Sequence, residues 1–118
     1  MAKHNETGTQ AEILAEQHLV SQGLTPLARN YHCKGGEIDL IMQQQRALVF
    51  VEVRFRKSAA FGSAAASVTR SKQQKIITAA QHFLIDNSKL ANLPCRFDVV
   101  AITAGQIEWI ENAFTLNE

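Results

Sequence analysis

Two apolar segments separated by a helix-forming stretch restrict the folds open to this chain more than any other feature. The segments "ALVFVEVRF" at 47–55 and "RFDVVAIT" at 96–103 have the length and β-branched content of buried strands. Between them, apolar residues recur at helical spacing and predict a helix over 69–85. These residues are Ile76, Ile77, Ala80, Phe83 and Leu84. A crossover helix between two strands favours parallel pairing of those strands in one sheet.

The rest of the chain supplies one more helix and further strands for the same sheet. Apolar residues at helical spacing predict a first helix over 6–22, which Gly23 ends. Three further strands are expected, at 25–32, 37–42 and 106–111. Segments of polar or small residues predict loops at 43–46, 56–67 and 86–94. The element order predicts an α/β fold, a three-layer-like sandwich in which helices pack on a mixed central sheet.

Length and composition set the class of protein. The whole chain, 1–118, is expected to form one domain, because 118 residues can bury a sizeable core. The longest apolar runs are far shorter than the roughly 20 residues that cross a bilayer, and the polar start "MAKHNETGTQAE" lacks the apolar centre of a secretory signal. Two cysteines are too few for a disulfide framework. We therefore expect a reduced, cytoplasmic protein without membrane association.

Asp39 and Glu52 stand in strands that could have been wholly apolar. Burial of an unpaired carboxylate is unfavourable, so these side chains should face a partner, a metal or water. In an antiparallel hairpin, a two-residue turn at Gln44–Gln45 or at Gln45–Arg46 puts both acids on one face, within about 8 Å. Like charges at that separation are destabilising unless a cation lies between them. Mg²⁺ suits such a site, because it takes few carboxylates and adds waters and phosphate oxygens.

A second interpretation of these acids needs no metal. They would then face solvent at a sheet edge and pair with Arg54 or Arg46, since ion pairs on sheets also perturb carboxylates. The apolar neighbours of Glu52 argue against a solvent-facing edge. A basic segment also follows Glu52 directly, which favours a functional site.

Half of the twelve Lys and Arg residues lie in an acid-free stretch between Glu52 and Asp86. Three of these cations fall at the start of the helix expected over 69–85, where they oppose the helix dipole. Together with the free N–H groups of that helix end they would bind phosphate, and the whole stretch suits a polyanionic backbone. A solvated helix surface is the alternative. The candidate nucleic-acid-binding residues are Arg56, Lys57, Arg70, Lys72 and Lys75.

Five motifs in a fixed order resemble one bacterial family. The segments "GGEIDLI", "LVFVEVRFR", "FG", "SVTRSKQQKI" and "RFDVVAI" are similar to those of the YraN-like family of uncharacterised proteins. The match covers nearly the whole chain, from Gly8 to Ile102. That family in turn resembles the PD-(D/E)xK nuclease superfamily, with a Holliday-junction-resolvase-like arrangement. The resemblance implies an αβββαβ restriction-endonuclease-like core, which agrees with the element order above.

The resemblance also implies a metal site. Asp39 corresponds to the metal-binding Asp of the second core strand, and Glu52 to the acid of the E-x-K signature on the third. With the carbonyl of Val53 they would hold Mg²⁺ or Mn²⁺ as the cofactor. Glu12 corresponds to a Glu that resolvase-like members contribute from the first helix.

Arg54 departs from the signature, which usually has Lys at this position. An Arg guanidinium keeps its proton in a protein and so cannot act as a general base. It can still hold a phosphate and stabilise developing charge. We therefore expect Arg54 to act with Glu12, Asp39 and Glu52 in metal-dependent hydrolysis of phosphodiester bonds, with branched DNA as one candidate substrate.

Two other functions stay open. The same fold could bind nucleic acid without cutting it, or the basic loop could contact an acidic protein partner. Salt-sensitive binding that survives loss of the acids would indicate the binding module. Nucleic acid, and DNA in particular, is the expected partner, although the residues do not themselves distinguish DNA from RNA. The resemblance also implies a homodimer, which no exposed apolar stripe in the sequence requires.

Overall fold

Five strands and two helices make up the fold, in the order that the sequence predicts. The computed structural model describes residues 2–57 and 62–115, with the backbone alone for 2–7. The elements are α1 (Ala2–Ser21), β1 (Thr25–Cys33), β2 (Gly36–Gln44), β3 (Ala47–Arg56), α2 (Arg70–Asp86), β4 (Cys95–Thr103) and β5 (Gln106–Phe114). Short 3₁₀ turns, Ala65–Ser67 and Ser88–Leu90, lie in the two longer loops.

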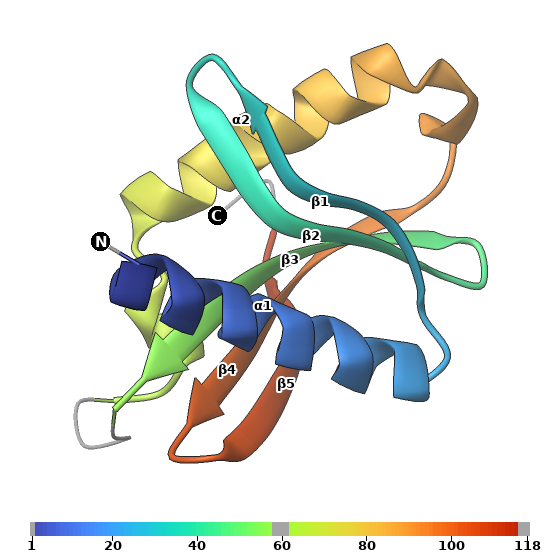
Figure 1. Cartoon of the computed structure of the whole chain (residues 1–118). Helices are drawn as coiled ribbons and strands as arrows, with labels where there is room; N and C mark the ends of the chain where they lie inside the picture. The colour runs from blue at the N-terminus through green and yellow to red at the C-terminus, as the bar shows by residue number, and fades with distance from the viewer. Residues whose placement is uncertain (1, 58–61, 116–118) are drawn as a thin grey trace.

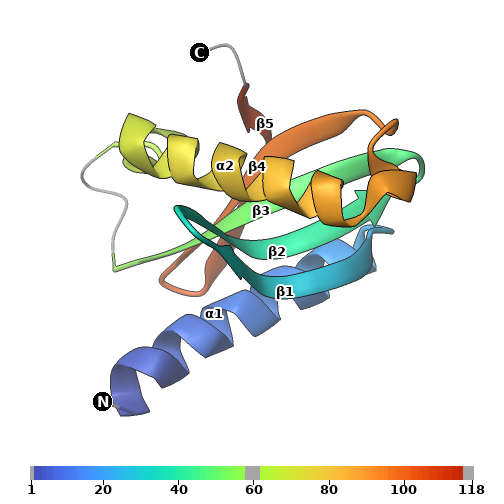
Figure 2. The ribbon, with the colours of Figure 1, turned by 90° about the horizontal axis from the view of Figure 1, so that it is seen from above.

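The strands form one mixed sheet in the order β1-β2-β3-β4-β5. The central pair, β3 and β4, is parallel, and the other pairs are antiparallel. The parallel pair confirms the crossover that α2 was expected to make (Figure 1). Figure 2 shows α1 and α2 on opposite sides of the sheet, so the molecule has the three layers that the sequence predicts. In the described part of the chain, no helix combines the length and apolar character needed to span a bilayer.

Each face of the sheet has its own apolar core. Under α2, Phe50 and Phe97 stack at 5.5 Å between ring centroids, and Phe83 of the helix meets Phe50 edge-on. Under α1, Ala15 and Leu19 pack with aliphatic side chains of β2, β3 and β4. Because β3 contributes alternate residues to both cores, it is the strand most enclosed by protein.

Some of the predicted element bounds differ from those in the structure. Helix α1 begins at Ala2, four residues before the predicted start. Strand β1 begins at Thr25 as predicted and contains Pro26, which an edge strand tolerates because one side of its backbone has no partner strand. Strand β5 continues to Phe114, which is 4% exposed and stacks on Phe97 at 5.0 Å. That long-range contact has no signature in local sequence.

The alternation of side chains in β1 and β2 breaks near Asp39. Ile38 packs in the core under α2 and Leu40 in the core under α1, although two residues apart in a regular strand share a face. The opposing residue of β1, Asn30, has φ of 49°, an uncommon conformation for a residue within a strand. The irregularity lies at Asp39, so the regular strand geometry is interrupted where the predicted site begins.

Candidate functional site

The site lies where β2 and β3 separate. Their ladder closes with Gln44 opposite Ala47, so the turn is Gln45–Arg46, the second of the two predicted registers. The last ladder pair at the other end joins Leu40 to Val51. Beyond that pair, a side chain replaces the backbone as acceptor: Oδ2 of Asp39 accepts a hydrogen bond from the Val53 N–H at 2.8 Å.

This bond also fixes what lines the gap between the strands. The N–H and C=O of one strand residue point toward the same neighbouring strand. The carbonyl of Val53 therefore faces the Asp39 side chain across the gap, as the N–H does. The Asp39 carboxylate thus faces the edge of β3 that carries this carbonyl, and both groups offer hard oxygen ligands suited to Mg²⁺.

Glu52 is buried in the centre of the sheet. The residue is 3% exposed, and β3 lies between β2 and β4, so the interpretation of a solvent-facing edge acid is wrong. Its Oε2 lies 3.7 Å from Nη1 of Arg54, two residues further along the same face, as the predicted alternation requires. Within the described residues, Oε1 of Glu52 is buried without a hydrogen-bond partner.

The carboxyl groups of Asp39 and Glu52 lie close enough to affect each other's ionisation. Burial and then the charge of Asp39 raise the pKa of Glu52, and against the opposing effect of Lys72 the resulting pKa is about 8. Burial also raises the pKa of Asp39, although the Val53 N–H favours its ionised form. When one carboxyl carries a proton, the two groups share a hydrogen bond. When both are ionised, no hydrogen lies between them, and the charges require another cation.

Lys72 brings a positive charge from α2 into this acidic gap. Its Nζ lies 3.4 Å from Oε2 of Glu37 and 3.9 Å from Oε2 of Glu52. Thr69 caps the helix by accepting a hydrogen bond from the Lys72 N–H at 3.2 Å, which fixes the first turn of α2. Lys72, one of the predicted phosphate-binding residues, therefore lies beside two acids, Glu37 and Glu52.

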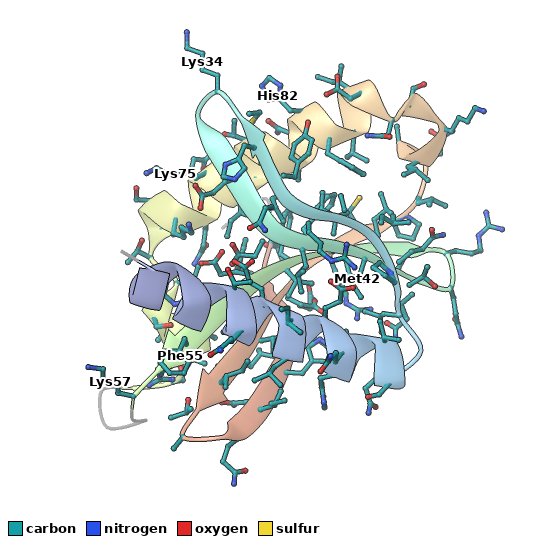
Figure 3. All side chains as sticks on the ribbon, viewed as in Figure 1. Lys34, Met42, Phe55, Lys57, Lys75 and His82 are labelled. Atoms are coloured by element: carbon teal, nitrogen blue, oxygen red, sulfur yellow. The ribbon has the colours of Figure 1, made fainter. Side chains whose placement is uncertain are left out.

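Glu12 approaches the same group from α1. Burial raises its pKa first, and the charge of Asp39 raises it next, while a hydrogen bond from the Asn30 side chain lowers it. Figure 3 shows side-chain oxygen atoms gathered in the space between α1 and α2. The structure thus brings Glu12, Asp39, Glu52 and Arg54 to one end of the sheet, as expected.

The remaining basic residues surround this end of the molecule. Arg56 donates a hydrogen bond to the carbonyl of Gly62 at 2.6 Å, so its guanidinium is partly engaged by the loop. Lys57, Arg70 and Lys75 are exposed. In Figure 3, Lys57 and Lys75 point outward on the side where β3 ends and α2 begins. Their role in nucleic-acid binding stays a prediction.

The carboxylates suit a magnesium-type ion with few protein ligands. In residues 2–57 and 62–115, no group of three or more His, Cys, Asp or Glu side chains is arranged to hold a metal. Mg²⁺, however, is usually held by one or two carboxylates and completes its shell with waters and substrate phosphate. Asp39, the Val53 carbonyl and Glu52, whose Oε1 has no hydrogen-bond partner among the described residues, match that ligand set.

Comparison with known proteins assigns the chain to a family. The model of an uncharacterised protein family, UPF0102, matches residues 11–102, most of the chain. The chain belongs to the UPF0102 family. This is the YraN-like family that the sequence motifs indicated. A UPF0102 protein of Saccharophagus degradans is 98% identical over 118 residues, which is 100% of both chains.

More distant relatives also match over most of their length. A UPF0102 protein of Aeromonas hydrophila is 54% identical over 108 residues, 91% of this chain and 83% of that protein. One of Nitrosococcus oceani is 50% identical over 117 residues, 96% and 94% respectively. The UPF0102 family assignment therefore covers the residues of the site as well as the fold.

Three residues of this UPF0102 site were not assigned a role from the sequence. Glu37 pairs with Lys72, and Asn30 contacts Glu12. Gly36 lets β2 approach α2, because an added Cβ would lie 2.3 Å from the backbone carbonyl oxygen of Lys75. The doubled glycine of "GGE" was the one available signal, since glycine marks a close backbone approach. The other two contacts cross between distant segments and leave no local pattern.

Proposed function

We propose that this protein is a metal-dependent nuclease that hydrolyses phosphodiester bonds in nucleic acid. The observation that carries the proposal is the buried Oε1 of Glu52, without a partner among the described residues and beside a second, half-buried carboxyl, Asp39. A buried anionic oxygen in this position is unfavourable unless a proton or a cation occupies the space. A divalent cation would satisfy it under conditions in which both acids are ionised.

The residues of the site would have different roles in such a reaction. Asp39, Glu52 and the Val53 carbonyl would hold Mg²⁺ or Mn²⁺. When bound, this ion supplies Lewis acidity, which activates a water and neutralises charge on the phosphate. Glu12, whose raised pKa keeps its proton affinity high, would orient water on the α1 side.

Arg54 and the exposed cations would hold the substrate. The Arg54 side chain is 37% exposed, so its guanidinium can contact a phosphate while it lies near Glu52. Arg56, Lys57, Arg70 and Lys75 would contact the flanking backbone, which predicts strong dependence of binding on salt. DNA is the expected substrate, with branched DNA as the first form to test.

Cleavage of labelled DNA tests the proposal. Branched and linear DNA would be incubated with the purified protein and Mn²⁺ or Mg²⁺, and products followed on denaturing gels. We expect Asp39→Asn and Glu52→Gln to lower the rate by about 10² or more. Glu108→Gln, an exposed change on β5, is the matched control and should cut at the rate of the unmodified protein. Failure of the unmodified protein to cut any of these substrates would refute the proposal, as would equal cutting by the two site variants.

A non-catalytic nucleic-acid-binding module is the second candidate. The observation that favours it is Arg54 itself, which replaces the usual Lys and cannot accept a proton. This function predicts binding that weakens with salt and is unchanged by Asp39→Asn. Fluorescence anisotropy with labelled DNA in chelator distinguishes the two.

A further inference from the structure

Lys72 differs from the other basic residues near the site because its charge is directed at acids. Its ammonium lies between Glu37 of β2 and Glu52 of β3, at 3.4 Å and 3.9 Å from their Oε2 atoms. Its side chain is 27% exposed, so the charge is partly hydrated. The acidic gap therefore already contains one positive charge when no metal is bound.

Both contacts are loose. Charge-assisted hydrogen bonds between ammonium and carboxylate are about 2.7 to 2.9 Å long, and both distances to Lys72 exceed that range. A lysine ammonium is also a compact, strongly hydrated charge on a flexible stem, without the fixed fork geometry of arginine. The Lys72 ammonium is thus attracted to two acids without being locked to either.

A divalent cation would compete with this ammonium. It carries twice the charge, and Coulomb attraction to the same carboxylate scales with charge at a given distance. Glu52 is the acid common to the Lys72 contact and the proposed metal ligand set. Binding of the metal at Glu52 therefore releases Lys72 from part of its attraction.

Resting on the function proposed above, we infer that Lys72 is an exchangeable counter-ion. In the metal-free protein its ammonium balances Glu37, together with Glu52 once that acid is ionised, and it moves to a phosphate oxygen of the substrate when a divalent cation binds. The phosphate is the natural acceptor, because it brings new anionic oxygens next to the cation just as the carboxylates become neutralised.

The backbone around Lys72 confines this exchange to the side chain. Thr69 caps the first turn of α2, and Gly36 holds β2 directly against the α2 backbone. The Cα of Lys72 is therefore fixed by the fold, while four methylene groups carry the ammonium. Arg54, in contrast, approaches Glu52 along the same strand and forms no ion pair with Glu37 in the described part of the chain.

Titration with Mn²⁺ alone tests the inference, because it measures metal binding and does not depend on catalysis. Free Mn²⁺ would be followed by electron paramagnetic resonance for the unmodified protein, Lys72→Met and Lys34→Met. Lys34 lies in the turn between β1 and β2 and points into solvent in Figure 3, so Lys34→Met removes the same charge away from the acids. We expect Lys72→Met to bind Mn²⁺ about tenfold more tightly, and Lys34→Met to be unchanged. Lys72→Arg, which keeps the charge, should bind like the unmodified protein.

Each outcome bears on a different claim. If Lys72→Met binds Mn²⁺ equally or more weakly, while Glu52→Gln abolishes binding, the counter-ion role is refuted and the metal site stands. If the unmodified protein binds no Mn²⁺, the proposed metal-dependent function is itself refuted. Circular dichroism would verify folding, and Lys72→Gln would replace Lys72→Met if the latter does not fold.

Binding of DNA tests the second half of the inference. Fluorescence anisotropy with a labelled oligonucleotide would be measured in chelator and in Ca²⁺. We expect Lys72→Met to weaken binding about tenfold in Ca²⁺ and to leave it unchanged in chelator, where the acids hold the ammonium. An equal loss under both conditions would show that Lys72 contacts the phosphate without any exchange.

Discussion

Replacement of Glu52 by glutamine should remove a pH-dependent loss of stability that the metal-free protein carries. In the unfolded chain Glu52 titrates near its ordinary pKa of 4.5, whereas in the folded protein the pKa is about 8. Between these pH values the folded protein keeps a proton that the unfolded chain has released. The free energy of unfolding therefore falls as the pH rises from about 5 toward 8.

The size of this effect follows from the same two values. A pKa raised from 4.5 to about 8, at 1.36 kcal/mol per pH unit, corresponds to a loss of at most about 5 kcal/mol. We expect the free energy of unfolding to fall by about 3 to 5 kcal/mol between about pH 5 and pH 8. Glu52→Gln mimics the protonated acid, because its amide can donate to Asp39. Its stability should therefore lack this component.

Urea unfolding in chelator, from about pH 5 to pH 9, measures the difference. The fluorescence of Trp109, the single tryptophan, reports unfolding, since its indole N–H donates to buried Asp98 at 2.9 Å. Subtraction of the Glu52→Gln curve removes the contribution of other titrating groups, and exposed Glu108→Gln should follow the unmodified protein.

Two results would refute the reasoning. Parallel curves for the unmodified protein and Glu52→Gln would show that Glu52 ionises without penalty, so Lys72 alone would compensate it. Mn²⁺ at about 100-fold above its dissociation constant should restore about 2.7 kcal/mol to the unmodified protein near pH 8. Equal stabilisation of Glu52→Gln by Mn²⁺ would place the metal elsewhere.

Three further changes test other parts of the structure. Gly36→Ala should lower the free energy of unfolding by about 2 to 3 kcal/mol, because its Cβ would meet the α2 backbone. Gly8→Ala, with open space around it, should instead raise the free energy of unfolding by up to about 1 kcal/mol. Urea unfolding that ranks the two variants the other way would contradict this. Asp98→Asn should lower the free energy of unfolding by about 3 kcal/mol, because both oxygens of this fully buried side chain accept hydrogen bonds and an amide would present N–H groups to donors. A decrease below about 1 kcal/mol in the same assay would argue against this role of Asp98. Arg54→Lys should raise the rate of DNA cleavage by roughly tenfold, since lysine can exchange a proton, whereas a lower rate on the gels would show that the guanidinium fork matters more.

The sequence by itself determined the element order and much of the site. Alternation and helical spacing are local properties, so the crossover between β3 and β4 and the helix α2 could be predicted from their own residues. The same alternation put Glu52 and Arg54 on one face, and the short hairpin restricted Asp39 to two registers, one of which is present. Family motifs added Glu12, which no local pattern distinguishes from a solvated helix residue.

Only the tertiary structure decided how the acids are partnered. The separation of β2 from β3 beyond Leu40 turns Asp39 onto the Val53 N–H, and the approach of α2 at Gly36 brings Lys72 between Glu37 and Glu52. Both depend on contacts between segments far apart in the chain. Local periodicity fixes which way a side chain points from its own element, whereas the partner that it meets depends on how the elements pack, and packing is set by the whole core.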